Sequence, residues 1–251
     1  MKRSISVLLV GESWVSTSTH IKGWDFFSSS VYEEGHAYLR EALSGEEFAF
    51  THMPGHRAPQ DFPLTQEELA AYDVVIISDI GANSLVLHPD VWLHGKTVPN
   101  RLMLLRDWVH RGGNLVMCGG YLSFAGIYGS AKYYRTPVEE VLPVTMHERD
   151  DRVEAPQGAR TTVTSASHPI LEGVSGEWPV LLGYNEVVAK DAAQVIAEVD
   201  GNPLIATMEV GSGRSMVWTS DIGPHWCPQP FVEWSGYARI WQQTMQWLVQ
   251  R

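Results

Sequence analysis

Short apolar runs that alternate with segments of helical pattern are the feature that most restricts the fold of this chain. The apolar runs are "SISVLLV" at 4–10, "EFAFTHM" at 47–53, "DVVIISDI" at 73–80 and "NLVM" at 114–117. Segments with apolar side chains at helical spacing lie between them, at 31–43, 65–72 and 100–113. This alternation predicts an α/β fold with a flavodoxin-like, doubly wound, mostly parallel central sheet and helices on both faces.

The second half of the chain has a different pattern. Between 141 and 220 the strand candidates follow one another through short turns: "ARTTVTSA", "NEVVAKD", "AQVIAEVD", "PLIATMEV" and "RSMVWTSD". Short turns favour antiparallel additions to the sheet. Residues 231–249 carry aromatic side chains at helical spacing, including Trp241, which predicts a helix packed on the core. No linker separates the halves, so we expect residues 1–251 to form one domain.

Composition narrows the partners and the location. The formal net charge of −11 has no basic patch, which argues against nucleic acid and anionic membrane surfaces. No apolar run reaches the length of a membrane span, and the apolar start is too short for a signal peptide. Cys118 and Cys227 have no paired spacing, so neither a disulfide nor a zinc site is suggested. We expect a cytoplasmic protein with a small-molecule substrate or ligand and no cofactor or metal; homo-oligomer formation stays open.

Polar residues and glycines follow several of the predicted strands. Because the carboxyl ends of parallel strands meet at one edge of a sheet, ligands bind there in open α/β folds. We therefore expect one concave site at this edge. Its candidates are Glu12, Asp79, Gly81, Asn83, Cys118, Gly119, Gly120, Asp221 and His225, together with His20 from the long polar segment that follows the first strand.

Cys118 is the sharpest catalytic candidate of this set. A Cys-Gly-Gly turn after a strand would raise the sulfur above the sheet, and the N–H groups of Gly119 and Gly120 could stabilise an oxyanion. A helix beginning after the turn would lower the pKa of the thiol. His225 could accept the thiol proton, and Asp221 or Glu12 could orient the imidazole. The alternative is a buried, inert cysteine that only packs.

Other histidines have simpler explanations. His52 and His56 lie in "HMPGHRAP", which has Pro and Gly and no metal-ligand spacing, so we interpret it as a loop. A metal-dependent hydrolase using Glu12, His20, Asp79 and His225 is a less favoured hypothesis, because these residues share no local motif.

Several motifs together resemble the class I glutamine amidotransferase-like superfamily, in its branch near the trehalose-utilisation-like proteins. They are "VHRGGNLVMCGGYLSFAG", "SHPILEGV", "VGSGRSMVWTSD" and "GPHW". The resemblance implies that Cys118 and Gly120 match the centre of the GxCxGxQ turn that holds the nucleophile in glutaminases. Val116 and Leu122 depart from that turn, and His225 is not followed two positions later by glutamate, which counts against glutamine hydrolysis.

Two functions follow from this sequence. The first is a cysteine-dependent amide hydrolase, related to glutamine amidotransferases, that acts on a small molecule with Cys118 as nucleophile. The second is a non-catalytic small-molecule-binding or subunit-assembly protein that keeps the fold without glutaminase chemistry.

Overall fold

The computed structural model describes residues 3–250, and its centre is an eight-stranded sheet. Parallel strands make up one part of this sheet: β4 (Phe48–Met53), β1 (Ile5–Gly11), β5 (Val74–Ser78), β6 (Asn114–Cys118) and β14 (Gly213–Trp218), in that order. Antiparallel strands complete it: β13 (Asn202–Val210), β12 (Gln194–Val199) and β9 (Thr161–Val163). Numbered by chain order, the parallel strands run 2-1-3-4-5, which is the flavodoxin-like arrangement. The predicted fold class is confirmed.

Two strands of the second half do not follow their predictions. "NEVVAKD" was expected to add to the central sheet, but β11 (Val187–Ala189) pairs with β7 (Val144–Met146) in a separate two-stranded sheet. "RSMVWTSD" was expected to add antiparallel to the sheet, but β14 is antiparallel only to β13 and pairs in parallel with β6. Its carboxyl end therefore lies at the same edge as those of β1 and β5, which is why the residues that follow β14 reach the same region.

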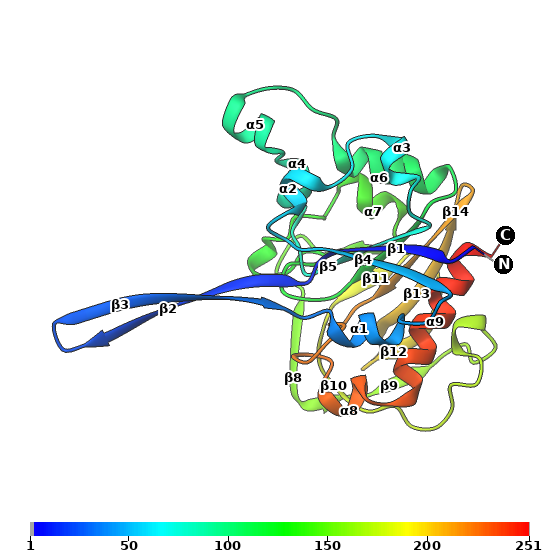
Figure 1. The fold of residues 1–251 in the computed structure, drawn as a ribbon. Helices are drawn as coiled ribbons and strands as arrows, with labels where there is room; N and C mark the ends of the chain where they lie inside the picture. The colour runs from blue at the N-terminus through cyan, green and yellow to red at the C-terminus, as the bar shows by residue number, and fades with distance from the viewer. Residues whose placement is uncertain (1–2, 251) are drawn as a thin grey trace.

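Helices cover both faces of the sheet (Figure 1). One face packs against α1 (Ala37–Ala42), α8 (Gln229–Val232), α9 (Ser235–Val249) and the short helix η2 (Pro169–Leu171). The other packs against α2 (Ala58–Asp61), α3 (Gln66–Leu69), α4 (Ala82–Val86), α6 (Arg101–His110) and α7 (Pro137–Val141). Further elements are α5 (Pro89–His94), η1 (Ile127–Gly129) and two small antiparallel pairs, β8 (Arg152–Ala159) with β10 (Leu181–Asn185) and β7 (Val144–Met146) with β11 (Val187–Ala189).

Local sequence explains several of these elements. The start of α3 is a capping box, in which the Thr65 hydroxyl accepts from the Glu68 N–H and the Glu68 carboxylate accepts from the Thr65 N–H. Helix α9 places the side chain of Trp241 in the core without exposed surface, as its helical aromatic spacing predicted.

A long two-stranded arm projects from the body and is the main departure from the sequence prediction (Figure 1). It consists of β2 (Ser13–Lys22) and β3 (Asp25–Glu34), paired antiparallel from Ser13–Glu34 to Lys22–Asp25. The long polar segment that carries His20, residues 16–30, had no predicted strand, and residues 31–43 were expected to form a helix; instead 31–34 belong to β3 and α1 begins only at Ala37. Residues 31–34, which would have formed the first turn of that helix, instead pair as a strand with residues 13–16 of β2.

None of the helices within residues 3–250 combines the length and the apolar character that crossing a membrane requires.

Candidate functional site

A cavity of about 350 Å³ lies at the carboxyl end of the parallel strands. Its wall includes the residues that follow β1, β5 and β14, and β1 and β5 flank the point where the strand order reverses. Ligands bind at this switch point in open α/β folds. The lining residues are Glu12, Trp14, Gly35, Asp79, Tyr121, Asp221, Gly223, Pro224 and His225.

The backbone is strained where two of the carboxylates enter the cavity. Glu12 and Asp79 have φ values of 50° and 43°, in the left-handed region that non-glycine residues rarely adopt. The preceding residue must be glycine, because a Cβ on Gly11 would lie 2.0 Å from the Ser78 carbonyl oxygen. Such strained positions concentrate at functional sites.

Glu12 is a carboxyl group in an environment that favours its neutral form. Burial, followed by the charges of Asp79 and Asp221, raises its pKa to about 8. The Ser78 hydroxyl donates a hydrogen bond of 2.5 Å to Oε2, which opposes the shift only in part. At neutral pH the group can therefore donate a proton.

His225 and Asp221 form a paired imidazole and carboxylate. His225 Nδ1 lies 2.8 Å from Asp221 Oδ2, and this hydrogen bond is the main cause that raises the pKa of the imidazole. The Trp226 N–H also donates to Oδ2, and the rings of Tyr121 and Trp226 pack against the imidazole. A carboxylate at Nδ1 leaves Nε2 as the proton-accepting nitrogen of the neutral ring.

Asp79 adds a second carboxyl group to the same cavity. Burial raises its pKa, while the N–H of Leu122 donates to Oδ1 at 2.7 Å and stabilises the ionised form. With Asp221 and a neutral Glu12, the cavity favours neutral or cationic ligands over anions.

Cys118 does not line this cavity, and the prediction that it shares the concave site is wrong. Its side chain has no exposed surface and belongs to the buried cluster on the α9 face, together with Val116 and Trp218. Alternation along β6 explains this, because residues two apart point to the same face. Burial, followed by the charge of Glu12, raises the pKa of the thiol well above its usual range, which disfavours the thiolate.

The turn after Cys118 also differs from the predicted oxyanion-binding turn. The Gly119 N–H donates to the carbonyl oxygens of Trp218 and Ser220, and the Gly120 N–H donates to Asn185 Oδ1. A helix beginning directly after the turn was expected to lower the pKa of the thiol, but residues 119–126 contain no helix. Both N–H groups serve the structure of the loop.

Three further predicted ligand-binding residues lie outside the cavity. His20 lies far along the arm, where its ring stacks on Phe27 and bonds the Ser29 hydroxyl. Gly81 and Asn83 belong to the start of α4, and Asn83 is exposed. Of the predicted site residues, the structure brings together Glu12, Asp79, Asp221 and His225.

Other lining residues and one cluster of side chains were not predicted from the sequence. Trp14 and Gly35 reach the cavity because both strands of the arm begin or end beside Glu12, and the arm itself was not predicted. At the base of the arm, Glu34, His36 and His52 bring ligating atoms within 4.8 Å of one another. The "EGH" segment, with its ligating side chains two residues apart, was the available signal.

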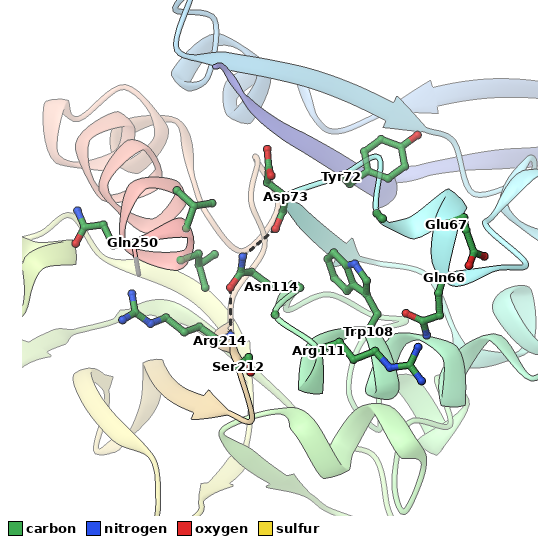
Figure 2. A pocket seen from close by; sticks show the side chains of 15 residues that line it. Gln66, Glu67, Tyr72, Asp73, Trp108, Arg111, Asn114, Ser212, Arg214 and Gln250 are labelled. Carbon is green, nitrogen blue, oxygen red and sulfur yellow. Dashed lines mark hydrogen bonds between the residues drawn. The ribbon is translucent and has the colours of Figure 1, made fainter. Parts of the chain in front are cut away.

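A second cavity, of about 550 Å³, lies at the opposite end of the sheet. Figure 2 shows Asn114 at its centre, where the side chain donates to the Asp73 carbonyl and accepts from the Arg214 N–H. These bonds align the starts of neighbouring strands, which gives Asn114 a structural role.

Comparisons with known proteins agree with this fold. The family model described as "Putative glutamine amidotransferase" matches residues 6–250. The solved structure of "Cytoplasmic Protein STM3548 from Salmonella typhimurium" is 42% identical, with a TM-score of 0.94, and the match covers 98% of this chain and 99% of that chain. The solved structure of "Cytoplasmic Protein STM1381 from Salmonella typhimurium LT2" is 41% identical, with a TM-score of 0.93, and the match covers 98% of this chain and 100% of that chain.

A more distant structure shares the fold alone. It is a "Putative thua-like protein from Bacteroides uniformis ATCC 8492", 11% identical with a TM-score of 0.59, and the match covers 100% of this chain and 94% of that chain. None of the curated proteins matches the chain.

Proposed function

This chain belongs to the family described as "Putative glutamine amidotransferase", and we propose that it acts on a small polar molecule at the Glu12–His225 cavity, by acid–base chemistry that does not use Cys118. One observation carries the proposal: a carboxyl group with a pKa of about 8 and an imidazole paired with a carboxylate line the same cavity. When two titratable groups in one site have environments that shift their pKa values differently, one can act as the general acid and the other as the general base.

The residues have separate roles in this proposal. Nε2 of the neutral His225 ring accepts a proton from water or from the bound molecule, and Asp221 stabilises the imidazolium that forms. Glu12 donates its proton to the group that leaves or gains negative charge, and both side chains then exchange protons with solvent. Asp79 accepts a hydrogen bond from a hydroxyl or amino group of the ligand.

The test uses a panel of neutral and cationic hydroxylated or amino compounds, screened for binding by ligand-observed NMR. We expect a binding compound to lose affinity in Glu12→Gln and His225→Gln and to keep it in Cys118→Ala. L-Glutamine should not be hydrolysed by either the wild type or Cys118→Ala. Hydrolysis of glutamine that depends on Cys118 would overturn the proposal.

A non-catalytic binding protein is the second candidate. Its support is the aromatic part of the cavity wall, since Trp14 and Tyr121 offer ring faces and edges for ligand packing without any reaction. Product formation from the bound compound distinguishes the two functions, because a binding protein returns it unchanged.

Location and assembly are part of the same proposal. The two Salmonella relatives are named cytoplasmic proteins, and we propose this location for the chain. We also propose a homo-oligomer, supported by the exposed arm, with residues 1–251 acting as one domain.

A further inference from the structure

The base of the arm carries three side chains that converge outside the cavity. Nδ1 of His36 lies 3.6 Å from Oε2 of Glu34, and Nδ1 of His52 lies 3.9 Å from the same oxygen. These separations are too long for hydrogen bonds. Two ligands at ordinary zinc distances and a tetrahedral angle are about 3.3 Å apart. The two nitrogen–oxygen separations exceed that spacing by less than about 1 Å, and the three ligating atoms all lie within 4.8 Å of one another.

The two imidazole side chains are buried and positioned so that they could bind a metal ion. Their side chains are only 4% and 5% exposed, and the buried Nδ1 of His36 has no hydrogen-bond partner. An imidazole nitrogen without a hydrogen-bond partner keeps its lone pair available for a metal ion when the ring is neutral.

The surrounding groups orient the ligands. His52 Nε2 donates to the Gly11 carbonyl oxygen at 2.9 Å, because a carbonyl can only accept, and this leaves the lone pair on Nδ1. The Tyr32 hydroxyl donates to Oε1 of Glu34 at 2.7 Å, so Oε2 is the oxygen that faces the histidines. Outer hydrogen bonds of this kind are typical of metal-binding His and carboxylate groups.

We infer that Glu34, His36 and His52 form a binding site for one divalent transition-metal ion such as Zn²⁺. Two His nitrogens and one carboxylate leave at least one coordination position for water or ligand. The site adjoins the cavity through Gly35, which lies between two of the ligands and lines the cavity. The inference does not depend on the proposed acid–base chemistry.

The experiment measures Zn²⁺ affinity of the full, tag-free chain by competition with a chromophoric chelator. The test variant is Glu34→Gln, and the matched control is Glu33→Gln, the adjacent arm residue, whose carboxylate bonds Trp14 and Ser16 instead. Both carboxylates are on exposed residues of β3, so circular dichroism should show unchanged folding. His52→Gln provides an independent second variant.

We expect the wild type and Glu33→Gln to bind one equivalent of Zn²⁺. Glu34→Gln and His52→Gln should weaken binding by more than about 100-fold, since losing even an outer partner of a metal ligand costs 10–100-fold. Absence of binding by the wild type, or equal binding by Glu34→Gln and the wild type, would overturn the inference.

Discussion

At the scale of single residues, Glu12 should make stability depend on pH. Its pKa is raised from 4.5 to about 8, so the folded protein holds a proton that the unfolded chain releases. This contribution is complete below the unfolded pKa and is lost as the pH rises through the folded one. We predict that Glu12→Gln, compared with the wild type by urea unfolding at about pH 6 and about pH 9, gains up to roughly 3 kcal/mol in relative stability between them. A pH-independent difference would contradict this.

A second residue-scale prediction concerns His225. Its pKa is raised mainly by the hydrogen bond to Asp221, so Asp221→Asn should lower it, as followed by NMR titration of the ring protons. Glu154 acts on the imidazole only through its charge, and Glu154→Gln should lower the pKa less. An unchanged titration of His225 in Asp221→Asn would show that the pair does not form.

Residue-level prediction from the sequence succeeded where it rested on strand ends. Glu12, Asp79 and His225 were found because residues after parallel strands reach one edge. Cys118 was misplaced because it is the last residue of β6 rather than the first after it, so it keeps the inward direction of Val116.

At the scale of elements, the arm is the main feature of the fold that the sequence did not predict, and β7, β8 and the short helices α2, α4, α5 and α7 were not predicted either. The strands of the parallel sheet and the longest helices were found from their apolar patterns, which β2 and β3 lack. The middle of the arm pairs Thr17, Ser18 and Thr19 with serines, and its side chains are exposed on both faces. No burial imposes a pattern on such a ribbon, so its sequence resembles a polar loop.

The arm also leads to a prediction about assembly. An isolated two-stranded ribbon is marginally stable in water, and this one exposes apolar side chains, including Val15, Ile21, Trp24, Phe26, Phe27 and Val31. A second copy is the favoured partner, because its identical arm offers the same apolar tip and an uncharged Ser/Thr middle that permits close pairing. Acidic Glu33 and Glu34 at the base can then lie near Lys22 at the tip of the other arm.

Light scattering tests this assembly. We expect an oligomer for the wild type and a shift toward monomer in Trp24→Ser combined with Phe26→Ser. The matched control is Trp92→Ser on α5, an exposed tryptophan outside the arm that should leave the molar mass unchanged. A monomeric wild type would refute arm-mediated association.

At the scale of the whole molecule, α9 should be essential for stability. Trp241 is fully buried against Trp218 and Tyr237, and Trp241→Ala should lower the free energy of unfolding by about 3 to 5 kcal/mol. Trp92→Ala, at an exposed position, should change it by less than about 0.5 kcal/mol. Chemical denaturation followed by fluorescence and circular dichroism should give coincident transitions if residues 1–251 unfold as one domain; separate transitions would contradict that.

We propose that the chemistry of this molecule lies in the Glu12–His225 cavity, whereas the side chain of Cys118 belongs to the core. The most direct measurement is the rate at which iodoacetamide labels Cys118 at neutral pH, read by peptide mass spectrometry in native and denatured protein. Full burial and the raised thiol pKa predict that Cys118 stays unlabelled in the native protein and reacts only after denaturation. Native labelling faster than that of a free model thiol, slowed by His225→Ala, would contradict the account and restore Cys118 as the nucleophile.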